Sequence, residues 1–358
     1  MKKIMSFYMF FFGLVFSYPS DLKYELIVNN LEVPWAFVFL PDNSILITER
    51  KGELIHFKDG NKTTVKNLPE IISKNQGGLL DIELHPNYLE NKWIYISYSS
   101  SNDKNNGTNT SVMRFQLIDN KAVNQEIIYK ALPNSKKNLH YGSRIIFDKN
   151  NYLFFSIGDR GYRDINPQDI TRDGGKIYRL HDDGRIPIDN PFVNEKNSKK
   201  AIYSYGHRNP QGMFYDRKNN EIWIHEHGPK GGDEINIVKR GKNYGWPLAS
   251  YGINYWGTKF TDKTSIKGMI DPYHYWVPSI APSGMVYIDN PNYPSLDKSF
   301  LIGSLKFEYL HQCIIDNGKI IEEKKLLNQI GRVRSIELDK NKNIYVGVEN
   351  LGIIKLIE

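Results

Sequence analysis

One histidine and one aspartate stand at the two ends of a predicted β-hairpin, where they could transfer a proton. His140 precedes the segment YGSRIIFDKNNYLFFSIGD, and Asp159 ends it. A hairpin brings its two ends together, and a carboxylate beside an imidazole fixes the ring tautomer and stabilises the imidazolium that forms on protonation. The pair therefore has the arrangement of a general base. The alternative is that His140 and Asp159 each stabilise a turn.

The segment 203–247 concentrates further polar residues on predicted loops. Pro210, which favours a loop or the entry to a strand, lies among Arg208, Asn209 and Gln211. The guanidinium of Arg208 could bind carboxylates or stabilise negative charge that develops in a reaction, and the two amides could fix a polar ligand. Each of these residues, taken singly, is more often a surface or turn residue.

A glycine-rich loop, GPKGGDE, runs from Gly228 to Glu234 in the same segment. Its carbonyl groups and carboxylates suit a hard cation such as Ca²⁺, which binds several oxygen atoms. The spacing is not that of an EF-hand, and a plain glycine-rich turn is the alternative. His225 and His227 could suggest zinc, but a third ligand is missing and oxygen donors predominate, so zinc is not expected here.

Dispersed cationic residues could complete a binding site for a ligand with several carboxylates. Arg332 and Arg334 lie two residues apart and therefore on one face of an extended segment. The other polar candidates are Gln76 and Lys306. If these side chains do not meet, they are ordinary solvated surface groups. The aromatic residues that could stack on a planar ring or a sugar, or pack in the core, are Tyr255, Trp256 and Trp276.

The elements that must position these residues are indicated by a pattern that recurs six times: an apolar run, a polar turn containing Asp or Asn, and a second apolar run. The copies span residues 34–50, 77–99, 142–159, 209–227, 281–304 and 333–350. Each copy is typical of a hairpin, and the spacing between copies leaves room for four strands. Radial repetition of such units avoids long unpaired edges. We therefore predict an all-β fold, a six-bladed β-propeller of four-stranded antiparallel blades, with two β-sandwich domains as the alternative.

In such a propeller the loops at one end of the blades converge on the mouth of a central channel. Residues that are distant in the sequence but stand at equivalent blade ends are then neighbours. We therefore expect the polar clusters to form one site.

The N-terminus predicts export from the cytoplasm. Two lysines precede an apolar run that ends at Phe16, and a small residue follows at a position suited to cleavage. The run is shorter than a membrane span of about 20 residues, so a retained membrane anchor is the weaker alternative. We predict a signal peptide at residues 1–17 and one propeller domain at residues 18–358, in a periplasmic or secreted protein.

Charge and cysteine content limit the remaining function classes. The formal net charge is +7, but Lys and Arg are spread through the turns, and the densest basic run is only Lys239–Lys242. Dispersed charge is typical of a solvated surface, so a nucleic-acid partner is not expected. The single cysteine, Cys313, is interpreted as a small buried residue. Without an internal disulfide, an exported chain depends on core packing or bound ions.

An ordered series of motifs along nearly the whole mature chain resembles the soluble quinoprotein glucose and aldose sugar dehydrogenases. The motifs are VPWAFVFLPD, QGGLLDIELHPNY, HYGSRIIFD, SIGDRG, GKIYRLHDDGRIPIDNPF, YGHRNPQGM, HEHGPKGGDEIN, NYGWP, PSIAPSGM and RVRSIELD. The resemblance implies a six-bladed propeller that uses pyrroloquinoline quinone (PQQ) and Ca²⁺ to oxidise the C1 hydroxyl of aldose sugars to the lactone. The implied partners are an aldose sugar and an electron acceptor that the sequence does not identify, with the chain a monomer or a homodimer.

The resemblance also implies roles for individual residues. His140 would be the base that takes the proton from the C1 hydroxyl, Asp159 would orient it, and Arg208 would lie beside the quinone carbonyl that is reduced. The implied PQQ contacts are Arg208, Asn209, Tyr255, Lys306 and Arg332, with Gln76 in the same pocket. Arg334 is added to this set because it is positively charged and lies two residues after Arg332. The implied calcium ligands are the carbonyls of Gly228 and Pro229, with Glu234 and Tyr244 at a further, structural calcium.

Two positions depart from the commonest family pattern. Ala36 stands where Gly is frequent, and Leu139 stands where glucose-specific members have an acidic residue, which predicts broad aldose specificity. The same fold also serves non-catalytic sugar- or protein-binding propellers and calcium-dependent lactonases. A binding module has no need of the His140/Asp159 pair together with Arg208 and Lys306, so the joint presence of these residues favours the dehydrogenase.

Overall fold

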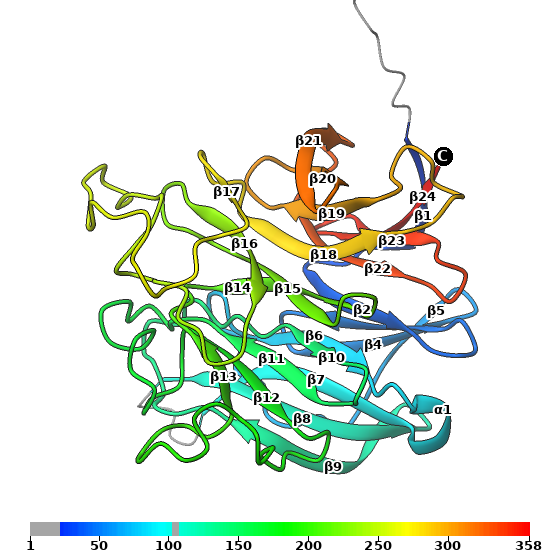
Figure 1. Cartoon of the computed structure of the whole chain (residues 1–358). Coiled ribbons are helices and arrows are strands. Elements are labelled where there is room, and N and C mark those ends of the chain that lie inside the picture. Colours follow the sequence, from blue (N-terminus) through cyan, green and yellow to red (C-terminus); the bar gives the residue numbers. More distant parts are fainter. Residues whose placement is uncertain (1–21, 102–106) are drawn as a thin grey trace, which may run out of the picture.

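The computed structural model describes residues 22–101 and 107–358, which form six antiparallel sheets of four strands each. The first strands of the sheets, β2, β6, β10, β14, β18 and β22, contact one another in a closed ring. Each sheet is therefore one blade around a common axis, and the predicted six-bladed β-propeller is confirmed (Figure 1).

The strands of each blade are given from the axis outward. Blade one consists of β2 (Pro34–Phe39), β3 (Ile45–Glu49), β4 (Glu53–Lys58) and β5 (Asn61–Thr64). Blade two consists of β6 (Leu79–Leu84), β7 (Trp93–Ser100), β8 (Asn109–Ile118) and β9 (Lys121–Lys130). Blade three consists of β10 (Ile145–Phe147), β11 (Leu153–Ile157), β12 (Lys176–Leu180) and β13 (Ile202–Tyr205). Blade four consists of β14 (Pro210–Asp216), β15 (Glu221–Glu226), β16 (Asp233–Val238) and β17 (His274–Trp276). Blade five consists of β18 (Pro282–Ile288), β19 (Ser299–Ser304), β20 (Tyr309–Asp316) and β21 (Lys319–Leu326). Blade six consists of β22 (Val333–Leu338), β23 (Ile344–Val348), β24 (Gly352–Ile357) and β1 (Lys23–Asn29). A short helix, α1 (Tyr88–Asn91), connects β6 to β7.

Each of the six sequence repeats forms the inner hairpin of one blade, as predicted. The polar turns use the conformations that Asn tolerates: Asn43, Asn151 and Asn220 adopt positive φ angles of 66°, 62° and 56°. A β-bulge recurs near the start of the inner strand in β2, β6, β14, β18 and β22. Bulges bend a strand and redirect the side chains beside them, here at the end where the chain enters each blade.

The ring is closed by a pairing between the two ends of the chain. The N-terminal strand β1 pairs antiparallel with β24 and supplies the outermost strand of blade six. Figure 1 shows the blue β1 beside the red β24. Because this pairing joins residues more than three hundred positions apart, it stabilises the whole ring rather than one blade.

The hydrophobic core lies between adjacent blades. Inner strands such as β3 and β11 are buried along their whole length, whereas the outer strand β5 is exposed throughout. One core cluster joins blades one and two through residues such as Leu46 and Ile96, and another joins blades five and six through residues such as Leu301 and Val346. The predicted burial of Cys313 is confirmed in the cluster between blades four and five.

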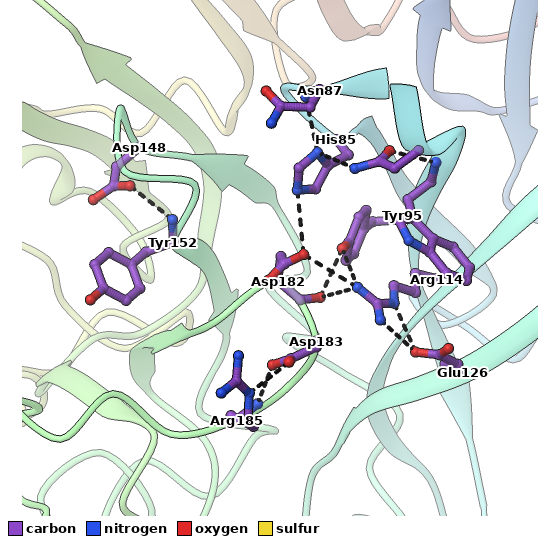
Figure 2. Close-up of polar contacts among 12 residues, drawn as sticks. His85, Asn87, Tyr95, Arg114, Glu126, Asp148, Tyr152, Asp182, Asp183 and Arg185 are labelled. Atoms are coloured by element: carbon purple, nitrogen blue, oxygen red, sulfur yellow. Dashed lines mark hydrogen bonds and ion pairs between the residues drawn. The ribbon is translucent and has the colours of Figure 1, made fainter. Parts of the chain in front are cut away.

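A polar network on the outer part of the propeller links blade two to the loop that follows β12 in blade three (Figure 2). Tyr95 donates a hydrogen bond of 2.7 Å from its hydroxyl to the carbonyl of Asp182. Arg114 donates from Nη1 to the same carbonyl at 3.2 Å and pairs through Nη2 with Glu126 at 2.7 Å. These groups satisfy one another, so the network is a structural contact between blades.

Replacing Arg114 by alanine is expected to lower the free energy of unfolding by about 1–3 kcal/mol, because the partly buried carbonyl of Asp182 loses one of its two donors and Glu126 loses its ion-pair partner. Arg185→Ala is the matched control. Arg185 pairs with Asp183 in the same loop, but its side chain is 74% exposed, so the expected change is within about 1 kcal/mol. Urea denaturation of the two variants measures the difference, and equal effects would show that the network contributes nothing beyond surface charge.

Two sequence predictions concern the N-terminus. The predicted signal peptide at residues 1–17 lies outside the described residues, and its cleavage stays a prediction. Within the described residues, no helix has both the length and the apolar character needed to span a bilayer.

Candidate functional site

The predicted site residues gather at one end of the propeller because of their positions in the inner hairpins. His140, Arg208 and Arg332 stand shortly before β10, β14 and β22, while Asp159 and Lys306 follow β11 and β19. The start of the first strand and the end of the second strand of an antiparallel hairpin lie side by side. These residues therefore stand at equivalent ends of their blades, and their meeting in one binding site stays a prediction.

His140 and Asp159 are in direct contact. The Nδ1 atom of His140 lies 2.6 Å from Oδ1 of Asp159, which is fully buried. The backbone N–H of His140 donates to Oε1 of Gln76 at 2.8 Å. Trp246 donates from Nε1 to the second carboxylate oxygen of Asp159 at 2.9 Å, and the N–H of Gly161 donates to the first at 2.7 Å. Both partners are therefore fixed from several sides.

The electrostatics of this pair define the protonation state of the ring. Burial, followed by the positive charge of Arg208, lowers the pKa of His140, so the imidazole is neutral at neutral pH. Burial alone would raise the pKa of Asp159, but its contacts with His140 and the charge of Arg208 bring this pKa below its usual value. An ionised carboxylate only accepts hydrogen bonds, so Nδ1 has the proton and Nε2 has the free lone pair.

Close backbone packing positions His140 against blade four. A Cβ atom at Gly158 would lie 2.4 Å from the carbonyl oxygen of His140 and 2.7 Å from Oδ1 of Asn209, so only glycine fits there. Oδ1 of Asn209 accepts the N–H of Gly142 at 3.0 Å. The amide of Asn209, a predicted cofactor contact, thus supports the chain segment on which His140 lies.

Arg208 is buried, and the hydrogen bonds of its side chain are to neutral acceptors. Its side chain donates to the carbonyl of His227 at 3.0 Å and lies 3.5 Å from the hydroxyl of Tyr255. Its backbone N–H donates to Glu226 at 2.6 Å, and its carbonyl accepts the N–H of Asp159 at 2.7 Å. The described contacts of the guanidinium therefore leave its positive charge available to an anion at the channel mouth.

The glycine-rich loop is shaped by Asp233. Its two carboxylate oxygens accept the N–H groups of Gly228, at 2.7 Å, and of Ala281, at 2.8 Å. Burial raises the pKa of Asp233 to about 6. A Cβ atom at Gly228 would lie 2.1 Å from the carbonyl oxygen of Gly232, so the chain folds tightly back on itself. The contacts of Asp233 and the close packing at Gly228 therefore hold the loop in one conformation and fix the directions of its carbonyl groups.

A small cavity of about 10 Å³ lies behind this loop and is lined by residues that include Glu226, Glu234 and Tyr244. Its size matches one ion or water molecule. Burial, together with the negative charge of Glu226, raises the pKa of Glu234 to about 8. A cation in the cavity would neutralise these two carboxylates, so the residues present fit a bound Ca²⁺.

The two histidines of this segment contact the neighbouring blade. His225 and His227 each direct Nε2 to a carbonyl oxygen of β18, at 3.1 Å and 2.6 Å. These are structural contacts between blades four and five.

Arg332 and Arg334 lie on one face, as predicted, and share one carboxylate. Nε of Arg332 lies 2.7 Å from Oε2 of Glu349, and Nε of Arg334 lies 3.0 Å from Oε1. Glu349 offsets one of these two positive charges. The side chain of Lys306 is exposed, with its Nζ 4.8 Å from the centre of the Phe307 ring.

The aromatic candidates divide into two groups. Trp276 is buried and donates from Nε1 to Glu323 at 2.6 Å, so it belongs to the core between blades four and five. Tyr255 and Trp256 are 67% and 75% exposed and remain available to a ligand.

Comparison with known sequences shows the family to which the chain belongs. The family described as Glucose / Sorbosone dehydrogenase matches residues 31–355. The chain belongs to this family. The resemblance to the soluble sugar dehydrogenases that its motifs predict is thereby confirmed.

Proteins named as sugar dehydrogenases resemble this chain, a member of the glucose/sorbosone dehydrogenase family, in sequence and in fold. Aldose sugar dehydrogenase YliI of Escherichia coli is 37% identical over 335 residues, which is 92% of this chain and 90% of the relative. The crystal structure of the soluble aldose sugar dehydrogenase from Escherichia coli in the apo-form has a TM-score of 0.90 and 36% identity, covering 94% of this chain and 99% of the other. Quinoprotein glucose dehydrogenase B of Acinetobacter calcoaceticus is 33% identical over 257 residues, 63% of this chain and 53% of the relative.

Three residues that sequence reasoning overlooked contribute to the site of this family member. Trp246 contacts Asp159, Glu226 contacts the backbone of Arg208, and Glu349 pairs with both arginines of blade six. Trp246 lies in the motif NYGWP and Glu226 in the motif HEHGPKGGDEIN, so these motifs are the sequence signal that could have identified the two residues.

Proposed function

We propose that the chain is a PQQ- and calcium-dependent aldose sugar dehydrogenase that oxidises the C1 hydroxyl of an aldose to the lactone. The observation that supports this most strongly is the contact of 2.6 Å between His140 and the buried Asp159 at the channel mouth. Membership of the glucose/sorbosone dehydrogenase family supports it independently.

In the proposed reaction His140 removes the proton of the C1 hydroxyl. Its Nε2 atom accepts this proton, while Nδ1 keeps its hydrogen bond to Asp159. The carboxylate of Asp159 then stabilises the imidazolium, and Trp246 prevents the carboxylate from turning away. The buried guanidinium of Arg208 stabilises negative charge that develops nearby.

The channel mouth has the donors needed to bind PQQ, which has three carboxylates. When bound, PQQ would supply the two-electron acceptor for the hydride from C1, and Ca²⁺ would polarise its quinone as a Lewis acid. Arg208, whose side chain contacts neutral acceptors, and the exposed Lys306 are the main cationic groups. The further contacts in the proposal are Gln76, Asn209, Tyr255, Arg332 and Arg334.

Calcium is proposed at two places beside Arg208. The carbonyls of Gly228 and Pro229, in the loop fixed by Asp233, would bind the ion next to the cofactor. Glu234 and Tyr244 would bind a structural ion. The hydroxyl of Tyr244 already donates to Ile237 at 2.6 Å, so its backbone carbonyl is the proposed ligand.

The pH dependence follows from the lowered pKa of His140. Burial and Arg208 keep the ring neutral to a pH below its ordinary value of 6.5, and a protonated ring cannot accept a further proton. We therefore expect kcat/KM to rise with pH through an apparent pKa below 6.5 and to stay high at neutral pH. Dye-linked initial rates across the pH range measure this, with stability checked at each pH. A fall of kcat/KM at acid pH with an apparent pKa above 6.5 would contradict the assignment of His140 as the base.

The substrate class proposed is aldoses in general, because Leu139 beside the base offers no charge to select one sugar. The proposed reaction takes place outside the cytoplasm and passes electrons to an acceptor that is not identified.

The test of the proposed function is dye-linked oxidation by the purified chain of a panel of hexoses, pentoses and disaccharides. Activity that requires both PQQ and Ca²⁺ is expected. Inactivity with every sugar would refute the proposal, and lactone hydrolysis without PQQ would favour a lactonase.

A further inference from the structure

A second group of metal-binding side chains lies on the outer strands of blades four and five. His311 and Cys313 are two residues apart on β20 and therefore face the same side of the sheet. Cys313 pairs in register with Glu323 of β21. His274 of β17 approaches the same carboxylate from blade four. Four potential ligands from three strands thus meet at one blade interface.

The spacing of these groups is close to that of a metal site. One ligand atom from each of His311, Cys313 and Glu323 lies within 4.8 Å of the others. Nε2 of His311 is 2.6 Å from Oε2 of Glu323, and Nε2 of His274 is 3.2 Å from Oε1. Bonds of about 2.0–2.3 Å to a tetrahedral zinc ion place ligand atoms about 3–4 Å apart. Small side-chain rotations are therefore sufficient for His311, Cys313 and Glu323 to enclose an ion, and His274 reaches this group through its contact with Glu323.

The hydrogen bonds within this group leave a polar atom unused. Nδ1 of His311 is buried and has no hydrogen-bond partner among the described residues, whereas Nε2 of His274 contacts Glu323. The whole of His311 is only 4% exposed. Buried nitrogen atoms without partners are uncommon because they lose their hydration without compensation. An ion bound through Nδ1 would supply the missing interaction.

We propose that His274, His311, Cys313 and Glu323 form a binding site for a divalent transition metal, with zinc as the expected ion. Two imidazoles, one thiolate and one carboxylate are ligands that zinc prefers, whereas calcium binds through oxygen atoms. As the sulfur–metal bond forms, the thiol of Cys313 releases its proton to solvent. The site differs in chemistry and position from the calcium sites at the channel mouth.

The surroundings of the cluster suit this role. The side chain of Glu323 is 32% exposed, which gives an ion a route from solvent. Trp276 donates from Nε1 to Oε2 of the same carboxylate at 2.6 Å and would orient it as an outer contact of the metal. Because β17 belongs to blade four while β20 and β21 belong to blade five, the ion would link two blades in a chain without a disulfide.

Cobalt titration of the purified full-length chain, stripped with a chelator, tests the proposal. Cys313 is the only cysteine in the sequence, so a thiolate-to-cobalt charge-transfer band reports this site alone. The expected result is a band that saturates at one cobalt ion per chain and disappears when zinc is added. Absence of the band from the folded chain would overturn the proposal.

Variants separate a metal site from a hydrogen-bonded cluster. Cys313→Ser is expected to abolish the band, and His311→Gln to weaken cobalt binding by about tenfold or more. His181→Gln, which changes a histidine on the loop after β12, is the control and should bind like the unmodified chain. Circular dichroism confirms that each variant is folded. Equal cobalt affinity in the unmodified chain and in folded His311→Gln would show that the cluster is structural only.

Discussion

Replacing His140 by alanine is expected to lower kcat by about 10²–10⁴-fold while PQQ still binds. The proposed base is lost, but the cationic groups Arg208 and Lys306 remain. The neighbouring Asp159 cannot substitute, because it is fully buried and both of its carboxylate oxygens already accept hydrogen bonds, from Gly161 and Trp246. Steady-state kinetics of the PQQ- and calcium-loaded variant, with an absorbance titration of PQQ, measure the two effects separately.

The controls for this experiment distinguish proton transfer from loss of structure. His181→Ala changes a histidine outside the site and should leave kcat within about twofold of the unmodified value. Asp159→Asn should also lower kcat, because a neutral amide no longer fixes the proton on Nδ1 or stabilises the imidazolium. An unchanged kcat in folded His140→Ala would refute the assignment of the base.

Removal of calcium is expected to abolish activity and to lower the melting temperature. Without a cation, the ionised form of Glu234 is unfavourable because of burial and the negative charge of Glu226, as its raised pKa indicates, and a bound cation would favour that form. An ion that binds only the folded state stabilises it by about 4 kcal/mol at one thousand times its Kd. Differential scanning calorimetry with a chelator and with added Ca²⁺ measures this stabilisation, and dye-linked rates measure the activity.

Single substitutions connect the calcium effect to the cavity. In Glu234→Gln one carboxylate ligand is lost, so the gain in melting temperature on adding Ca²⁺ should fall by half or more. Glu195→Gln, at an exposed position, is the control and should retain the full gain. Equal gains in the two variants, or no gain in the unmodified chain, would remove Glu234 from the proposed ligands.

The blades could be predicted from the sequence because each inner hairpin repeats a local pattern. Alternating apolar runs and turns with residues such as Asn43 and Asn151 define these hairpins without reference to the rest of the chain. The pairing of β1 with β24 has no such signal, since its partners stand at opposite ends of the sequence and no turn joins them. Closure of the ring is a property of the whole fold.

The site could be predicted where two residues are related by one hairpin. His140 and Asp159 are neighbours for this reason, and the contact is present. Contacts between blades could not be foreseen in this way: Trp246 of the loop after β16 reaches Asp159 in blade three. Charge and spacing also did not predict the partner of the two arginines of blade six, because Glu349, which shares its carboxylate between Arg332 and Arg334, follows β23.

Uptake of PQQ tests the central claim most directly. The purified apoprotein, loaded with Ca²⁺, is titrated with PQQ while the absorbance spectrum is recorded. The account predicts a saturable spectral change that reaches its end point at one PQQ per chain and that is weakened in Arg208→Ala. A folded, calcium-loaded chain that takes up no PQQ would contradict the account and favour a propeller that binds or hydrolyses its ligand without a quinone.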